Sequence, residues 1–238
     1  MTGLEDVFRS GTLEMSASPW ESLAGNPAWS SVLTNRILAV VAVVLLVADL
    51  LDLFRLAPQL IYCYDRSRGA ETLEHSLGMA RSRNSAAFFL SLPLCLVADR
   101  YALFRPGVWS VIPPAWSAPA TIGVLVVFLL LRRFCYLLLR PRRMGTESFD
   151  ALRHNLYNYL FLLVPVILLT VAVSKAAGMA DTLTRSILLV ETALAWGFAL
   201  LRSGQILGAH CSGLSTFLYL CGLELLPAAA LVTAAVLF

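Results

Sequence analysis

One carboxyl group, that of Glu224, stands alone within a long apolar segment. The segment, residues 214–238, exceeds the roughly 20 residues that cross a bilayer, and Glu224 is its only charge. Because an ionised carboxylate at mid-membrane costs about 2.5 kcal/mol or more, Glu224 is expected to face protein, pair with a cation or carry a proton. Pro227 lacks a backbone N–H, which leaves the carbonyl near Leu223 in need of a partner. Two interpretations stay open: a packed polar contact between helices, or a transport or catalytic carboxyl.

Two acids and one base interrupt the first apolar stretch of the chain. Asp49, Asp52 and Arg55 follow one another at a spacing of three residues, which places them on neighbouring positions of one helical face. Such a row is costly in contact with lipid. We therefore expect all three side chains to face the interior of a helix bundle.

Two adjacent arginines interrupt a later apolar stretch. Either the span ends at Leu131, or Arg132 and Arg133 lie in its inner half. The second interpretation is favoured, because the first leaves a very short span.

The charged residues of these stretches fall at similar depths when each helix rises 1.5 Å per residue. This coincidence predicts an internal polar layer in which acids and bases neutralise one another. Arg202 is the expected partner of Glu224, since a short loop makes the last two spans antiparallel neighbours. Asn155 and Asn158 are expected to bond across helices. The candidate members of the layer are Glu224, Arg202, Asp49, Asp52, Arg132, Arg133 and Asn158.

Composition shows which elements must position these groups. Hydrophobic residues make up 58% of the 238 residues, charged residues only 14%, and the mean hydropathy is +0.76. A soluble domain would carry about 25% charged residues. The expected fold is therefore all-α, a polytopic membrane bundle of about six transmembrane helices, with a polar N-terminal tail (1–36) and one transmembrane domain (37–238). The expected spans are 37–56, 85–104, 120–139, 156–173, 187–207 and 214–238.

Orientation follows from the lysines and arginines, which favour the cytoplasmic side. The connectors that alternate to one side, the first and third among them, carry twice as many Lys and Arg residues as the other side. This asymmetry predicts that both termini lie outside. The frequent Ala, Leu, Val and Arg suggest a bacterial chain, for which the location would be the inner membrane. The net charge of +3 is too small and scattered for a nucleic-acid surface.

No catalytic signature stands out in the sequence. It contains no G-x-S-x-G, H-E-x-x-H, P-loop or G-x-G-x-x-G pattern. The three histidines, His75, His154 and His210, do not stand at the spacing of zinc ligands. We expect no metal and no cofactor.

The C-terminal third resembles a known family on the pattern Tyr-Leu-Cys-x-x-Glu-x-x-Pro. Weaker support comes from Arg202, Asn155 and Asn158 in the two preceding spans. The pattern is similar to that of a Bacteroidetes inner-membrane family catalogued as domain of unknown function 4271. That resemblance implies a multi-span bacterial membrane protein and supplies no activity. The matching residues are Tyr219, Leu220, Cys221, Glu224 and Pro227.

Three functions are compatible with these features. The leading expectation is a structural or accessory component that binds a partner membrane protein or a lipid through the polar layer. The first alternative is a small transporter or proton-coupled permease that uses an intramembrane carboxyl. The second is a membrane-embedded enzyme acting on a lipid, with the arginines against a phosphate head group. An enzyme is the less favoured outcome, and the lipid bilayer is a partner in every case.

Overall fold

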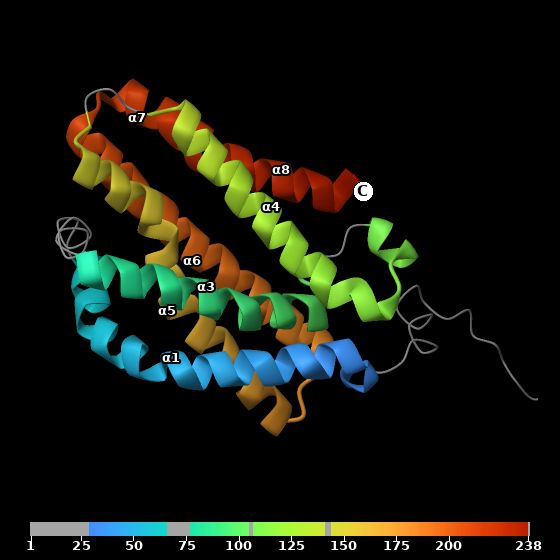
Figure 1. Cartoon of the computed structure of the whole chain (residues 1–238). Helices are drawn as coiled ribbons and strands as arrows, with labels where there is room; N and C mark the ends of the chain where they lie inside the picture. Colours follow the sequence, from blue (N-terminus) through green and yellow to red (C-terminus); the bar gives the residue numbers. More distant parts are fainter. Residues whose placement is uncertain (1–28, 66–76, 105–106, 141–143, 238) are drawn as a thin grey trace, which may run out of the picture.

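A computed structural model describes residues 29–65, 77–104, 107–140 and 144–237 of the chain. Within these ranges the backbone forms six long helices and no strand (Figure 1). The sixth long helix is continuous but changes its winding, so it carries three labels. The helices are α1 (Leu33–Asp65), α3 (Leu77–Arg100), α4 (Ser117–Leu138), α5 (Thr146–Ala176), α6 (Asp181–His210) and the series α7 (Gly213–Leu220), η5 (Cys221–Leu225) and α8 (Leu226–Leu237).

Five of the six helices in the described part of the chain are long and apolar enough to cross a membrane. The chain is therefore a multi-pass membrane protein, and the expected all-α helical bundle is confirmed. A helix suits this setting because it satisfies its own backbone hydrogen bonds, which lipid cannot do. The five candidate spans cover 33–56, 114–138, 146–176, 181–210 and 213–235.

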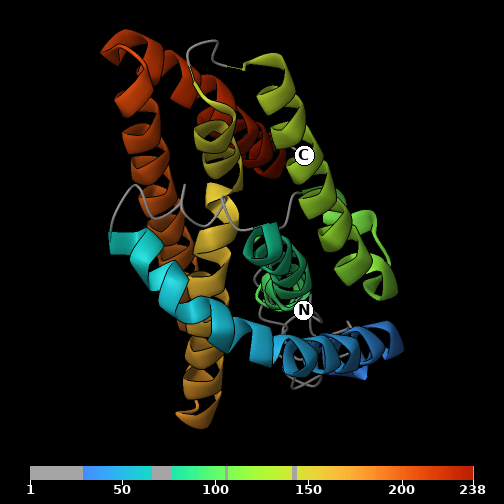
Figure 2. The same ribbon diagram turned by 60° about the vertical axis from the view of Figure 1, so that its left-hand side comes forward.

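The remaining helix, α3, contains most of the segment expected as the second span. It is not among the five, because Arg81, Arg83, Asp99 and Arg100 lower the hydropathy of its two ends. It lies between α1, α4 and α5 and packs against all three (Figure 2). A helix surrounded by other helices needs less lipid-compatible surface than one at the periphery.

The helices extend beyond the apolar runs that predict them. α5 begins at Thr146 rather than 156, and α6 at Asp181 rather than 187. Each has an acid in its first turn, Glu147 or Asp181, which complements the partial positive charge of a helix N-terminus. Apolar content marks the part that fits the membrane, whereas the hydrogen-bonded helix continues into its polar flanks.

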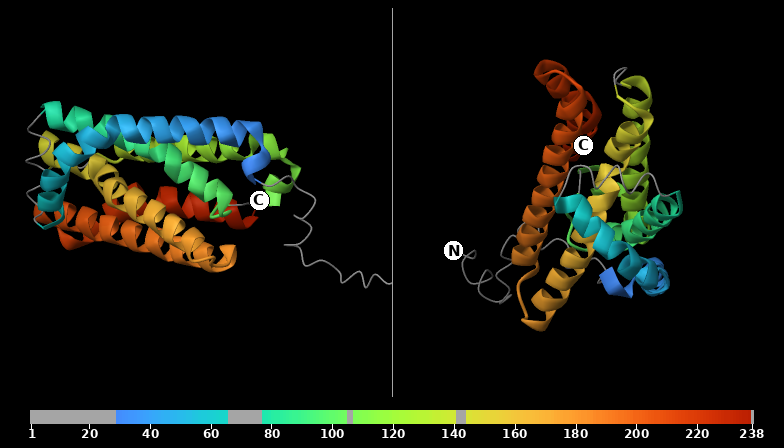
Figure 3. Two further views of the ribbon diagram at one scale, coloured as in Figure 1. Left: turned by 90° about the horizontal axis from the view of Figure 1, so that it is seen from below. Right: turned by 90° about the vertical axis from the view of Figure 1, so that its left-hand side faces the viewer.

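Successive helices run in opposite directions, so their ends collect at two poles (Figures 1 and 3). One pole gathers the C-terminal ends of α1, α4 and α6 with the N-terminal ends of α3, α5 and α7. The opposite pole gathers the start of α1, the end of α3 and the turn between α5 and α6. This alternation agrees with the up-and-down path expected of the spans.

At the opposite pole, the carboxylate of Asp99 forms hydrogen bonds that link three segments of the chain. Trp29, in the short 3-10 helix η2 (Trp29–Ser31), donates from Nε1 to Asp99 Oδ2 at 2.7 Å. The hydroxyl groups of Ser117 and Thr121 donate to the other oxygen of Asp99. These contacts join the segment before α1 to the end of α3 and the start of α4.

Two apolar clusters form separate parts of the core. The N-terminal cluster joins α1, α3 and α5 through Leu56, Ala86, Ala87, Leu90, Phe161 and Val164. The C-terminal cluster joins α4, α5, α6 and η5 through Cys135, Tyr136, Met144, Phe149, Leu152, Ile206, Leu207 and Leu223. Each cluster has a buried carboxyl on a helix that contributes to it, and the two carboxyls have different surroundings.

Candidate functional site: a buried arginine, glutamate and tyrosine

Glu224 lies in a short π-helix, Cys221–Leu225, inside the last span. Leu226 donates its backbone N–H to Cys221 O, five residues back, which is the hydrogen bond of a π-helix. Pro227 follows directly and has no N–H to return the ladder to normal spacing at its own position. The wider winding therefore coincides with the proline and with the motif residues from Cys221 to Pro227.

The π-helix also approaches the end of α4 closely. A Cβ atom added at Gly222 would lie 2.5 Å from Leu139 Cδ1, so only a glycine fits against this leucine without movement. Glu224 contacts the arginine that α4 places about two turns before Leu139.

Arg132 of α4 is the partner of Glu224. Its Nη2 donates to Glu224 Oε1 at 2.7 Å, and its Nε donates to Oε2 at 3.2 Å. Two parallel hydrogen bonds of this kind are the strong geometry for an arginine and a carboxylate. Arg132 is 4% exposed and Glu224 7%, so the pair is excluded from both lipid and water.

Tyr136, one turn after Arg132, completes the cluster. Its hydroxyl group donates to Glu224 Oε1 at 2.6 Å, and Arg132 Cζ lies 4.9 Å from the centre of its ring. The tyrosine is 1% exposed. A hydrogen bond to a charged acceptor and a cation on the ring face both stabilise the ion pair.

Two further helices supply the outer contacts. Arg132 Nη1 donates to the backbone carbonyl of Arg153 in α5 at 2.9 Å. Ser203 of α6 lies with its hydroxyl group 3.4 Å from Glu224 Oε1. Asn155 of α5 donates from Nδ2 to Ser203 Oγ at 3.0 Å and to Ala199 O at 2.8 Å. The cluster thus joins α4, α5, α6 and η5, and both oxygens of Glu224 are occupied.

The polar layer expected from the sequence is only partly present. Arg132 and Glu224 meet, but the expected pairing of Arg202 with Glu224 is wrong. Arg202 Nη1 instead donates to Gln205 Oε1 at 2.7 Å, on its own helix. Arg133 is exposed on the outside of α4, since a helix turns adjacent residues about 100° apart.

The acidic row of α1 does not face the interior as a unit. Asp49 is buried, whereas Asp52 and Arg55 form a loose 3.9 Å pair with side chains 46% and 81% exposed. The prediction that all three face the bundle is therefore wrong for Asp52 and Arg55. Each step of three residues drifts about 60° around a helix, so Arg55, two steps after Asp49, lies about 120° away from it, which is enough to carry Arg55 to the surface.

Asp49 and Asn158 are buried but lie outside the Arg132 cluster. Asp49 belongs to α1, which packs against α3, and Asn158 lies on α5. The single layer expected at one depth is thus divided between two regions. Depth along a helix is readable from the sequence, whereas the face that a helix presents to its neighbours depends on the packing.

Sequence reasoning missed two members of the cluster, Tyr136 and Ser203, whereas the expected bond of Asn155 across helices is confirmed by its contacts with α6. The spacing of Arg132 and Tyr136 is the signal that could have found the first, because residues i and i+4 lie on one helical face. Ser203 carries no comparable signal, since serine is common within membrane helices.

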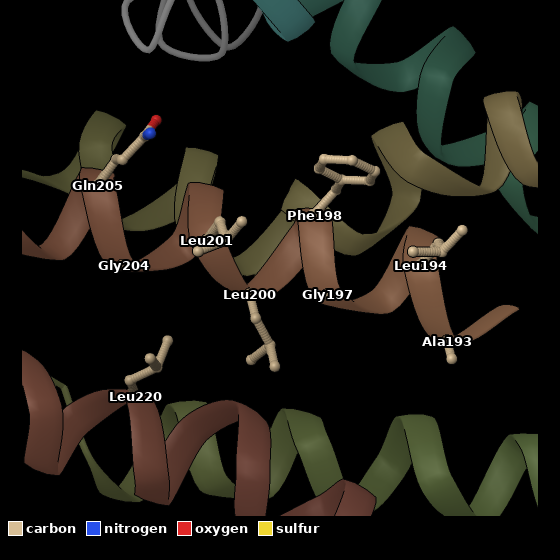
Figure 4. Close-up of a pocket in the computed structure, with 9 residues that line it drawn as sticks. All are labelled: Ala193, Leu194, Gly197, Phe198, Leu200, Leu201, Gly204, Gln205 and Leu220. Atoms are coloured by element: carbon tan, nitrogen blue, oxygen red, sulfur yellow. The ribbon is translucent and has the colours of Figure 1, made fainter. Parts of the chain in front are cut away.

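A shallow apolar groove runs along the outside of α6 (Figure 4). Leu200 and Leu220 point toward each other across it, while Phe198 and Gln205 point away from the C-terminal helix. Added Cβ atoms at Gly197 and Gly204 would meet nothing within 4 Å, so neither glycine is needed for packing within the described chain. The groove is separate from the Arg132 cluster, and no cluster of metal-ligating residues occurs among the described residues.

Comparisons of the chain with protein-family models, with curated proteins and with solved structures give no match.

Proposed function

We propose that this multi-pass membrane protein is a structural or accessory component of a membrane assembly. The observation that carries the proposal is the buried pairing of Glu224, whose two oxygens accept from Arg132 and Tyr136. A transport or catalytic carboxyl needs a free position for a substrate or a proton. Both oxygens of Glu224 already accept from side chains of the same chain, so we assign to it the role of holding the C-terminal helix against α4, α5 and α6.

The surface that suits a partner is the groove on α6. Its lining is apolar, and Gly197 and Gly204 lower its floor so that another helix could approach closely. Membrane helices associate by such close packing of small residues, because lipid gives no hydrophobic drive between them. Glycine costs about 1 kcal/mol relative to alanine in a helix interior, which here is not offset by any internal contact. The proposed occupant is a transmembrane helix of a partner protein.

The proposal is tested by a photo-reactive amino acid introduced into the full chain in native membranes. At Phe198, beside the groove, it is expected to give one discrete protein adduct. Val126, equally lipid-compatible but on α4, serves as the control position and is expected to give only lipid adducts. Gly204→Leu should abolish the adduct at position 198, whereas Gly123→Leu on α4 should not. Lipid adducts alone at position 198 would contradict the proposal.

The permease alternative is addressed by reconstitution. Protein in liposomes loaded with a pH-sensitive dye is expected to pass protons no faster than empty liposomes. Flux that Glu224→Gln abolishes while the helical content is kept would favour a transporter instead. Native mass spectrometry tests the lipid-enzyme alternative. If the protein is such an enzyme, a lipid with a phosphate head group is expected to stay bound to it.

The finer location stays part of this proposal, namely the bacterial inner membrane with both termini outside. What supports it is the arginine count of alternate connectors, together with the grouping of the helix ends at two poles. Reporter fusions at the C-terminus would test it. The relation to domain of unknown function 4271 is likewise proposed, on the motif residues that surround the π-helix.

A further inference from the structure

Asp49 is a buried acid, 6% exposed. Among the described residues its Oδ2 has no hydrogen-bond partner, and no cation lies within ion-pair distance of it. The helix that carries it, α1, spans Leu33–Asp65, which places Asp49 at the middle of the helix. The residues one turn to either side, Leu46 and Leu53, pack against the N-terminal apolar cluster.

The helices packed against α1 offer no compensating charge near its middle. α3 carries no charged residue between Arg83 and Asp99, and α5 carries none between His154 and Lys175. The titratable side chains in these stretches are neutral groups, namely Cys95, Tyr157 and Tyr159. The nearest base toward the N-terminal end of α3 is Arg83, which donates from Nε and Nη2 to Asn84 Oδ1.

The charged group closest to Asp49 along its own helix is another acid. Asp52 stands one turn further on, about 5–6 Å away between Cβ atoms, and it is partly exposed beside Arg55. A second negative charge at this distance opposes ionisation of Asp49, as does the surrounding hydrocarbon. Asp52 faces more open surroundings than Asp49.

We propose that Asp49 is a proton-binding site at the centre of α1, occupied at neutral pH, with Asp52 as the neighbouring group through which the proton exchanges toward the end of the helix. The ligand is the proton itself, which leaves Asp49 as a neutral carboxylic acid. A neutral acid packs within an apolar cluster at far lower cost than a carboxylate. This site is independent of the Arg132 cluster and of the groove on α6.

Infrared spectroscopy of the full chain tests the inference. The aspartate side chains are labelled with carbon-13 at the carboxyl carbon, which separates their bands from those of glutamates and lipid esters. An aspartate in water is ionised at pH 7, so a protonated acid band at that pH has to come from a buried group. The expected result is one such band, shifted in heavy water and lost in Asp49→Asn.

Asp52→Asn is the matched control and should keep the acid band while losing a carboxylate band. A spectrum without a protonated aspartate band at pH 7, or a band that survives Asp49→Asn, would overturn the inference. A carboxylate band of Asp49 that responds to sodium would also overturn it, in favour of a cation site. Asparagine has nearly the size of aspartic acid, so the variant is expected to keep its helical content.

A second readout uses the wild-type chain and needs no variant. Dicyclohexylcarbodiimide is apolar and adds to protonated carboxyl groups inside membranes, where the acid becomes an N-acylurea. Peptide mapping is expected to place the adduct on Asp49 and not on Glu224, whose oxygens hold Arg132 and Tyr136. An adduct on Glu224 with Asp49 unmodified would contradict the proposal, and where neither residue reacts the infrared band decides.

Discussion

Two carboxyl groups are buried to the same degree in this protein, and their surroundings are opposite. Glu224, 7% exposed, accepts hydrogen bonds from a bidentate arginine and a tyrosine hydroxyl. Asp49, 6% exposed, has an oxygen without a hydrogen-bond partner in the described part of the chain and an acid as its nearest charged neighbour on the helix. Burial by itself therefore does not determine what a membrane carboxyl does.

The difference lies in which helices meet around each group. Three helices converge on Glu224, and each contributes polar groups: α4 the arginine and the tyrosine, α5 a carbonyl oxygen and an amide, and α6 a hydroxyl. Around Asp49 the neighbouring stretches of α3 and α5 are uncharged. The first group is paired and structural in our interpretation, and the second is the proposed exchangeable proton site.

Removal of Arg132 is expected to lower the stability of the protein more than any other single change considered for the two sites. Arg132→Leu leaves Glu224 buried without a counter-charge, which is expected to lower the free energy of unfolding by about 3–5 kcal/mol. The measurement is unfolding of the purified chain in mixed micelles, followed by tryptophan fluorescence. Arg133→Leu, one residue further on the exposed side of α4, is the matched control and should change stability little.

A double variant sharpens the same prediction. Arg132→Leu combined with Glu224→Leu removes both charges and should recover most of the lost stability, because an apolar pair of similar volume can replace a buried ion pair. A double variant no more stable than Arg132→Leu alone would show that the uncompensated carboxylate is not the cause.

Loss of the tyrosine hydroxyl group should have an intermediate effect. Tyr136→Phe keeps the ring under the guanidinium group and removes one hydrogen bond to a charged acceptor, which is expected to cost about 1.5–3 kcal/mol. Tyr219→Phe is the control, since Tyr219 packs against the same apolar cluster and is not among the residues that contact Glu224. Equal effects of the two changes in the micelle unfolding assay would contradict the assigned role of the Tyr136 hydroxyl.

The outer hydrogen bonds should matter less. Ser203→Ala removes a long 3.4 Å contact with Glu224 and one link to Asn155. A hydrogen bond between membrane helices contributes on average about 0.6 kcal/mol, so the loss of unfolding free energy should be of that order. A loss as large as that of Tyr136→Phe would place Ser203 among the principal partners of Glu224.

The smallest effect is expected in the other region. Asp49→Asn replaces a neutral acid with a neutral amide of nearly equal size, so stability at pH 7 should change by less than about 0.5 kcal/mol. Glu224→Gln, the same chemical change in the paired site, should cost several times more because it leaves Arg132 uncompensated. Similar losses for the two variants in thermal unfolding would remove the distinction between the sites.

Much of the architecture is readable from the sequence. Apolar runs longer than the bilayer is thick predict helices wherever they occur, since the backbone has no other partner there. The burial of Glu224 is also predicted, because it is the only charge of the last apolar run and a charge in contact with lipid is costly. The position of Arg132 inside a helix rather than after one also follows, because α4 would otherwise be too short to span.

The partners of these groups are not readable in the same way. Arg202 and Arg132 stand at comparable depths, and sequence proximity favours Arg202. In the structure the partner is Arg132, and Glu224 lies in the π-helix before Pro227, where Gly222 packs against the Leu139 side chain just after α4. A change in helical winding of this kind shifts every later side chain around the axis, and hydrophobic patterning alone gives no sign of it.

The sequence by itself determined that this chain is a membrane protein, that it is helical, and that its few intramembrane charges need partners or protons. These conclusions follow from the cost of polar groups in hydrocarbon, which depends on composition and length. Only the tertiary structure decided that Glu224 is satisfied and Asp49 is not. That distinction depends on which faces of α1, α4, α5 and α6 meet, and the energy of helix packing is spread over many small apolar contacts that leave no single signature along the chain.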